Sequence, residues 1–259
     1  MGKFHFKQFS VRNEDSAMKV GTDAVLLGAA MTLPAEGGRL LDIGTGTGVI
    51  ALIAAQRLSS CPGLSIRAAH SSATLPSRSF RITAIDIDPA SAAEAASNFA
   101  SSPWATHLAA HNLSLAGFAA GAGPDGPALF DSIFSNPPYF EESLRNPDPR
   151  EAAARHNSSL SYRDIIAYAS CHLNPGGTLS LILPAEVETA LGRCASSFGL
   201  RMFRILRIRG TTRKPCSRII AEFRPSDSPL PLKEDTLTLM EDGSRSAAYA
   251  ALTEELYLC

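Results

Sequence analysis

A strand, a glycine-rich turn and a helix follow one another near residue 40, and this order constrains the fold more than any other feature. Residues 39–43 form an apolar run of strand length, the turn carries Gly44, Gly46 and Gly48, and residues 49–58 are helix formers with apolar spacing. Such an order opens a doubly wound α/β sheet with a ligand at the turn. The glycines allow the backbone to approach a ligand closely. Their spacing does not match the G-x-G-x-x-G pattern of a dinucleotide site.

A second strand is predicted over residues 81–86 and ends in a carboxylate, Asp86. Asp88 and Pro89 then begin a helix that runs to about residue 100, with the proline in a favourable first-turn position. A carboxylate at the end of the second strand can accept hydrogen bonds from both hydroxyls of a ribose. The alternative role of a helix-capping or turn aspartate suits Asp88 better than Asp86.

The tetrapeptide Asn136-Pro137-Pro138-Tyr139 follows another apolar run, residues 129–135. The prolines remove backbone donors, so the chain must leave the sheet here. The Asn136 side-chain oxygen and the Pro137 carbonyl are then two acceptors beside an aromatic ring. This arrangement suits a planar group that carries an NH2, with the ring of Tyr139 stacked on its face. The alternative is a simple proline turn that ends a strand.

The chain as a whole divides into three parts. Residues 1–38 are expected to form an N-terminal arm and a helix that pack on the core, and residues 39–224 the main α/β domain. Residues 59–80, which are rich in Ser, Ala, Pro and Arg, read as a surface insertion within that domain. Residues 225–259 form a C-terminal extension. Within the main domain, residues 200–208 and 218–223 predict a closing hairpin.

Composition excludes several classes of protein. The chain has 259 residues, 45% of them hydrophobic and 19% charged, which is typical of a globular protein with a sizeable core. No apolar run is long enough to span a bilayer, and the N-terminus lacks the apolar core of a signal peptide. The five cysteines form no CxxC pair and the histidines have no ligand spacing, so we expect a reducing, cytoplasmic location and no metal site.

A strongly basic stretch lies in the predicted hairpin. Residues 201–224 hold eight Arg or Lys side chains against the single acid Glu222. A solvated strand face explains two or three of these charges, whereas the full number favours a surface for a polyanion such as a nucleic acid.

Taken together, these motifs resemble class I S-adenosylmethionine-dependent methyltransferases that act on an amino nitrogen. The order of the glycine turn, Asp86 and the Asn-Pro-Pro-Tyr tetrapeptide carries this resemblance. Residues 6–9 (FKQF) and 18–28 (MKVGTDAVLLG), with Arg155-His156 and Lys214-Pro215, are similar to the bacterial valine-tRNA adenine-37 N6-methyltransferase family.

The resemblance implies a Rossmann-like fold with a central, mostly parallel seven-stranded sheet and a C-terminal antiparallel hairpin. It implies an enzyme that methylates an adenine 6-amino group in tRNA, with Asn136, Pro137 and Tyr139 as catalytic residues. We expect the protein to be a monomer. The cofactor, S-adenosylmethionine, would be held by Lys19, Thr22, Asp42, Gly44, Gly46, Gly48 and Asp86. RNA contacts would come from Arg155, Arg209, Arg213, Lys214 and Arg218.

Other activities share the Asn-Pro-Pro-Tyr tetrapeptide or the fold. Glutamine N5-methyltransferases of release factors usually carry an N-terminal helical domain, for which 38 residues leave no space. Guanine N2-methyltransferases of ribosomal RNA more often have phenylalanine at the position of Tyr139, and a DNA adenine methyltransferase needs a recognition domain. A cofactor-binding RNA chaperone without activity is the non-enzymatic alternative, although the intact Asn136 and Asp86 argue against it.

Overall fold

The computed structural model describes residues 2–16, 18–60, 79–123, 128–138, 160–227 and 231–258. Tyr139 and Arg155 lie outside these residues. The same is true of most of the expected insertion, since only residues 59, 60, 79 and 80 of it are described.

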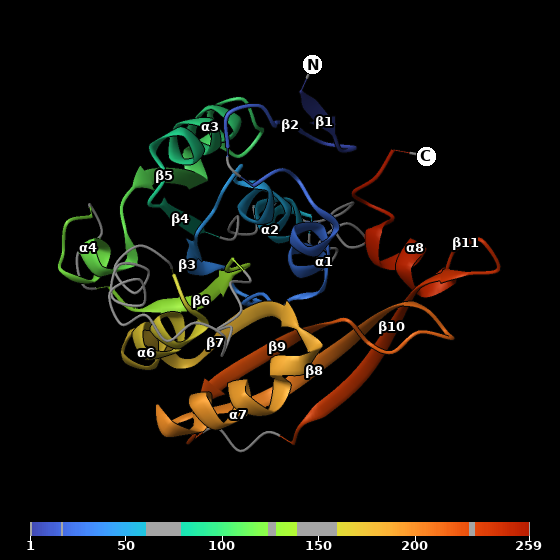
Figure 1. The fold of residues 1–259 in the computed structure, drawn as a ribbon. Coiled ribbons are helices and arrows are strands. Elements are labelled where there is room, and N and C mark those ends of the chain that lie inside the picture. The colour runs from blue at the N-terminus through green and yellow to red at the C-terminus, as the bar shows by residue number, and fades with distance from the viewer. Residues whose placement is uncertain are drawn as a thin grey trace, which may run out of the picture.

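One twisted sheet forms the centre of the molecule (Figure 1). Its strands lie in the order β11-β10-β8-β9-β7-β6-β3-β4-β5. Seven of them confirm the expected mostly parallel sheet with a C-terminal antiparallel hairpin, in which β9 is antiparallel to both neighbours. Their bounds are β3 Gly38–Ile43, β4 Phe80–Asp86, β5 Leu108–Asn112, β6 Phe130–Ser135, β7 Leu173–Pro184, β8 Leu200–Thr211 and β9 Arg218–Pro225.

Successive side chains of the buried strands pack alternately into two separate apolar cores, one on each face of the sheet. Leu40 packs in one core and its neighbour Leu41 in the other, because successive residues of a strand point to opposite faces. The first core is covered by α1 Thr22–Ala30, α2 Val49–Ser59 and α3 Pro89–Ala100. The second is covered by α4 Leu115–Ala119, α6 Tyr162–His172 and α7 Glu188–Ser197 (Figure 1). Helices on both faces keep this largely parallel sheet buried.

The C-terminal segment continues the sheet, which the sequence did not predict. β10 Lys233–Glu241 pairs in parallel with β8, and β11 Ser244–Arg245 turns back beside it. α8 Ala247–Thr253 follows. The sheet therefore has nine strands among the described residues, two more than expected.

The two ends of the chain meet. β1 Lys3–His5 and β2 Ser10–Arg12 form a small antiparallel hairpin, and Phe6 pairs with Tyr257 in an isolated bridge. The amide of Lys7 donates to the carbonyl of Leu256 at 2.9 Å. The rings of Phe6 and Tyr257 stack with centroids 6.1 Å apart, so the N-terminal arm is fixed by the C-terminal segment.

Three local details differ from the sequence interpretation. A helix that starts at Thr22 and Asp23 would be expected to use one of these side chains as its cap, but α1 begins after Gly21 with no side-chain cap. The short helix α4 was not predicted, and β7 includes residues 174–177 (NPGG), whose composition favours a turn. Tertiary pairing outweighs the local turn preference in β7, since β6 and β7 share a ladder with an irregularity between Phe130 and Ser132.

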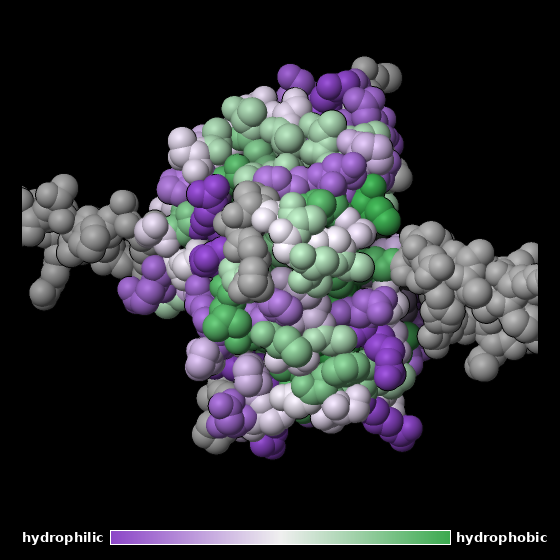
Figure 2. All heavy atoms as spheres, turned by 90° about the vertical axis from the view of Figure 1, so that its left-hand side faces the viewer, coloured by the Kyte–Doolittle hydropathy of each residue, from purple (hydrophilic) through white to green (hydrophobic). Residues whose placement is uncertain are grey.

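Polar and apolar residues are intermixed on the face that carries β5 and α4 (Figure 2). Strand β5 is the edge of the sheet on this side, and most of its residues are only half-buried. In the described parts of the chain, no helix combines the length and the apolar character needed to cross a bilayer.

Candidate active site

The turn after β3 is built on three glycines in the left-handed region. The φ angles of Gly44, Gly46 and Gly48 are 72°, 56° and 81°, a conformation that costs other residues energy. A Cβ added at Gly48 would lie 2.5 Å from Cε1 of Phe99, so α3 packs directly against the turn. The amides of Gly44 and Thr45 both donate to the carbonyl of Ile85, which ties the turn to the end of β4.

Asp86 holds the same turn from the next strand. Its Oδ2 accepts from the amide of Gly46 at 2.8 Å, and its Oδ1 accepts from the amide of Asp88 at 2.9 Å. Burial raises the pKa of Asp86, and these two hydrogen bonds oppose that rise. Asp88 caps α3 by accepting from the amide of Ser91, as the sequence interpretation expected of it. Asp86 therefore lies half-buried at the carboxyl end of β4, and its two oxygens still have lone pairs for hydroxyl donors.

Asp42 is the most unusual carboxylate of the site. It is fully buried, and its Oδ2 accepts from the Thr45 hydroxyl at 2.7 Å, while its Oδ1 has no partner among the described residues. Burial raises the pKa of Asp42 to about 7; the Thr45 bond opposes this rise and the nearby Asp86 adds to it. A buried acceptor without a donor is costly and is often found at functional sites. It fits a ligand that brings a positively charged or N–H group to the turn.

The pairing of β3 with β6 brings Asn136 beside the glycine turn. Asp42 lies opposite Phe134 in this parallel pair, so Gly44 and Asn136 leave the sheet at the same level. The hydroxyl of Ser135 donates to the carbonyl of Ile43 at 2.6 Å and joins the two strand ends. Asn136 is half-buried and Pro137 is buried, whereas Tyr139 lies outside the described residues.

A pocket joins these elements with the N-terminal segment. It is lined by Met18, Lys19, Ala24, Gly44, Thr45, Gly46, Thr47, Val49, Ile50 and Asn136. The structure thus brings Lys19, Gly44, Gly46 and Asn136 together. Thr22 is exposed and is not part of the lining, and neither are Asp42, Gly48 and Asp86, which shape the turn from behind or from the side.

Sequence reasoning missed Met18 and Thr45 at this pocket. Thr45 follows Asp42 by three residues, the spacing at which a side-chain hydrogen bond across a turn forms, and this signal was available. The place of Met18 depends on how the neighbouring residues 12–16 pack against the turn, for which the sequence carries no local signal.

Most of the arginines in the predicted hairpin have structural partners. Arg204 pairs with Glu222, and Arg207 pairs with Glu188 and Glu234. Arg218 pairs with Asp23 at 2.9 Å. The local excess of positive charge is therefore smaller than the sequence count suggests.

Three further residues predicted to bind RNA differ in their surroundings. Arg209 donates to the hydroxyl of Thr238 at 2.9 Å, while Arg213 and Lys214 are exposed in the turn between β8 and β9. Strand β9 is antiparallel to both β7 and β8, so β8 runs in the same direction as β7, β6 and β3. The turn after β8 therefore lies at the same end of the strands as Asn136, which follows β6. Arg155 lies outside the described residues.

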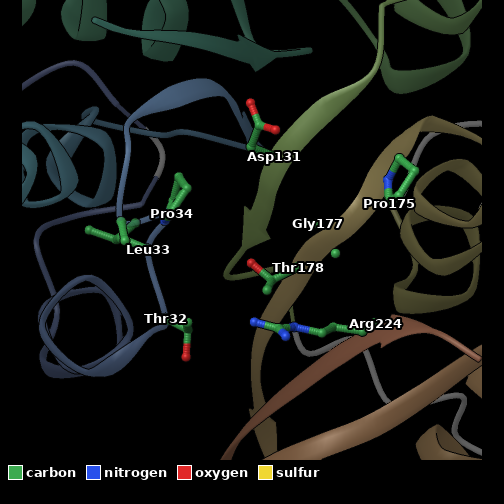
Figure 3. Close-up of a pocket in the computed structure, with 10 residues that line it drawn as sticks. Thr32, Leu33, Pro34, Asp131, Pro175, Gly177, Thr178 and Arg224 are labelled. Atoms are coloured by element: carbon green, nitrogen blue, oxygen red, sulfur yellow. The ribbon is translucent and has the colours of Figure 1, made fainter. Parts of the chain in front are cut away.

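A larger pocket of about 390 Å³ lies at the opposite end of the strands, near the start of β6 and β7. In Figure 3 the guanidinium of Arg224 points between Thr32 and Thr178, with Pro175 and Leu33 at the sides. None of the residues predicted to bind cofactor or RNA lines it. No group of His, Cys, Asp and Glu side chains in the described residues is arranged to hold a metal ion.

No protein-family model matches the chain. Its structure is similar to a predicted O-methyltransferase from Agrobacterium tumefaciens, with a TM-score of 0.61 and 19% identity over 92% of this chain and 98% of that one. It is also similar to a methyltransferase from Pyrococcus furiosus, with a TM-score of 0.51 and 20% identity over 82% and 88% of the two chains. At these identities the likeness establishes the fold.

Curated relatives are much more similar in sequence. The tRNA1(Val) (adenine(37)-N6)-methyltransferase of Bacteroides fragilis is 35% identical over 98% of this chain and 97% of its own length. The proteins of the same name from Photobacterium profundum and Parabacteroides distasonis are 34% and 36% identical, and each alignment covers 98% of this chain. These alignments extend over both the N-terminal arm and the C-terminal strands. The chain belongs to the tRNA1(Val) (adenine(37)-N6)-methyltransferase family.

Proposed function

We propose that the protein transfers a methyl group from S-adenosylmethionine to the 6-amino group of adenine 37 in a valine tRNA. Family membership supports the reaction and the substrate. One structural observation supports the location of the active site: Asn136 and the glycine turn line the same pocket. A methyl donor bound over the turn would therefore face an amino group held at the end of β6.

The residues around the turn fit such a donor. The glycines let the ligand approach the backbone. The buried Oδ1 of Asp42 has no hydrogen-bond donor among the described residues, and the ammonium group of the bound ligand would supply one. Asp86 would accept from the ribose hydroxyls, and Lys19 would close the pocket from the N-terminal side. Gly48 and Thr22 would act indirectly. Gly48 has no side chain and so allows α3 to pack against the turn, and Thr22 is the first residue of α1.

When bound, S-adenosylmethionine supplies a methyl group on a positively charged sulfur. The protein's part is to orient the nucleophile, since the lone pair of the adenine amino group is delocalised into the ring. Asn136 and the carbonyl of Pro137 would accept its two hydrogens and favour a pyramidal nitrogen, with Tyr139 stacking on the base. Positioning of this kind supplies most of the rate enhancement when no proton has to be removed first.

The Asn136→Ala variant tests the catalytic assignment. We expect kcat to fall about 10²–10³-fold, as for the loss of one directed hydrogen-bonding group. The Kd for S-adenosylmethionine, measured by calorimetry, should stay within about twofold because the cofactor is bound by other residues. Equal losses in kcat and cofactor affinity would contradict the role of Asn136.

The substrate is tested with transcripts of valine tRNA and labelled methyl donor. Label should enter the wild-type transcript and be absent from a transcript with guanine at position 37. Label in guanine, or in glutamine of a release factor offered beside the tRNA, would contradict the proposed reaction.

We also propose that tRNA approaches over the turn between β8 and β9. Its support is the exposed pair Arg213 and Lys214 at the edge that carries Asn136. Changing both to Gln should weaken tRNA binding and reduce the slope of log K against log salt by about 0.7–0.9 per lost contact. Arg201→Gln is a matched control, because Arg201 is exposed at the opposite end of the same strand. Equal effects of the two changes would place the RNA elsewhere.

A cytoplasmic location and a monomeric state complete the proposal. The free thiols of Cys171, Cys194 and Cys216 are in keeping with a reducing compartment. Light scattering coupled to size exclusion checks the monomer, and a mass of two chains would contradict it.

A further inference from the structure

Helix α3 carries a stripe of polar residues on its buried face. Ser91, Glu94 and Asn98 are each between 2% and 3% exposed, and their spacing of three and four residues places them on one side of the helix. Charged and amide side chains are rarely buried so fully unless hydrogen bonds satisfy them. Most of their partners lie in residues 12–16, which together with Met18 and Lys19 are called the strap below.

Glu94 binds the backbone of the strap. Its Oε1 accepts from the amides of Glu14 and Asp15 at 2.7 and 3.0 Å, and its Oε2 accepts from the amide of Ser16 at 2.8 Å. Burial acts to raise the pKa of Glu94, but these three amides and the charge of Lys19 bring it below its ordinary value. The carboxylate is thus ionised at neutral pH, and three consecutive N–H groups converge on it.

Asn98 joins the strap to the glycine turn. Its Oδ1 accepts from the amide of Arg12 at 2.7 Å, and its Nδ2 donates to the carbonyl of Arg12 at 3.0 Å. The same Nδ2 donates to the carbonyl of Thr47 at 2.9 Å. Ser91 adds a hydroxyl contact to Ser16 at 3.0 Å. One face of one helix therefore fixes both the strap and the turn.

The strap packs over the glycine turn. The Ser16 hydroxyl donates to the carbonyl of Met18, and both atoms lie within 4 Å of a Cβ placed at Gly46. Lys19 donates to the carbonyl of Glu14 at 2.7 Å, which folds the strap back on itself. Met18 and Lys19 then line the pocket with Gly44 and Asn136.

We propose that Ser91, Glu94 and Asn98 are positioning residues that hold the strap over the glycine turn and so set the affinity for S-adenosylmethionine. This inference rests on the proposed cofactor site. Preorganisation explains the effect, because a strap that is already ordered does not lose conformational freedom when the ligand binds.

Glu94→Gln tests the contact with little change in shape. It replaces one acceptor oxygen by an NH2 group that faces amide donors, so the strap should detach locally. Hydrogen exchange of the amides of residues 14–16 should accelerate about tenfold or more, while exchange in β4 stays as in the wild type. The Kd for S-adenosylmethionine should rise about tenfold, and kcat at saturating cofactor and tRNA should stay within about twofold.

Three further variants make the result decisive. Asn98→Ala removes the bridge to the turn and should raise the same Kd, which keeps the proposal testable if Glu94→Gln does not fold. Ser97→Ala is the matched control, because Ser97 is exposed on the same helix, and it should change neither exchange nor affinity. Glu94→Asp, which keeps the charge, should restore part of the affinity that Glu94→Gln loses.

The outcomes separate the two proposals. A wild-type protein that binds no S-adenosylmethionine would overturn the proposed function. A wild type that binds it, beside Glu94→Gln and Asn98→Ala variants with unchanged Kd, would overturn the role of the strap alone. A fall in kcat without a change in Kd would also overturn it.

Discussion

Two fully buried carboxylates, Asp42 on β3 and Glu222 on β9, have opposite surroundings. Asp42 accepts one hydrogen bond and keeps an oxygen without a partner among the described residues. Glu222 accepts from the amide and hydroxyl of Thr32 at 2.6 and 3.0 Å. It also accepts from the Ser180 hydroxyl at 2.9 Å and from Arg204 at 2.5 Å.

The difference separates a structural network from a functional one. Glu222 joins the segment that follows α1 to β7 and β8, and its four donors balance the cost of burying its charge. Asp42 is balanced only in part, and it lies behind the turn at which a ligand is proposed to bind. A protein tolerates such an unsatisfied group where binding, rather than folding, supplies the missing partner.

Glu222→Ala should have the largest effect on stability. We expect a loss of about 5 kcal/mol, the top of the range for a broken buried ion pair, because Arg204 and three other donors lose their acceptor together. Urea unfolding followed by circular dichroism measures it. The folded protein should still bind S-adenosylmethionine with its normal Kd, and a loss below about 1 kcal/mol would contradict the structural role of the network.

Asp42 should make stability depend on pH in the opposite sense to an ordinary carboxylate. Its pKa is raised to about 7, so its contribution is fully present below about pH 4 and is lost as pH rises through 7. The wild type should lose roughly 4 kcal/mol relative to Asp42→Asn between pH 4 and pH 8.

The measurement is the difference between the two unfolding free energies at each pH. Asp227→Asn, a change of the same kind at an exposed position, is the control. Asp42→Asn should also weaken cofactor binding. A difference that is constant with pH would show that the carboxyl is not buried as described.

Gly48→Ala should cost about 2–3 kcal/mol, because the left-handed φ of 81° and the overlap with Phe99 both penalise a Cβ. Gly192→Ala is a matched control in α7, where a Cβ meets nothing within 4 Å. That change should instead stabilise the protein by about 0.5–1 kcal/mol, since alanine favours a helix interior. Thermal unfolding distinguishes the two, and equal shifts would contradict the packing of α3 on the turn.

Arg218→Gln should have the smallest effect, about 0.5 kcal/mol, because its ion pair with Asp23 is partly exposed. Since Arg218 is held by Asp23, tRNA binding should fall less than in the Arg213→Gln variant. A filter-binding assay at two salt concentrations compares them, and an equal or greater loss for Arg218→Gln would show that the ion pair opens on RNA.

Local sequence patterns were sufficient for much of the molecule. The apolar runs predicted the strands β3, β4, β6, β8 and β9, and Asp88 was correctly read as a helix cap. The strand β10 was missed, because Lys233, Glu234 and Asp235 are polar and only pairing with β8 makes them a strand. The basic hairpin was overestimated, because the acids that neutralise Arg207 and Arg218 come from other segments.

The sequence by itself determined the order of the elements and the residues that follow each strand, since glycine, proline and strand periodicity act within a few residues. Only the tertiary structure decided which of these residues meet. Glu94 and Asn98 of α3 accept hydrogen bonds from the amides of Glu14 and Arg12, which lie 80 and 86 residues earlier in the chain. Such contacts depend on how the helix packs on the sheet, and no local pattern encodes that packing.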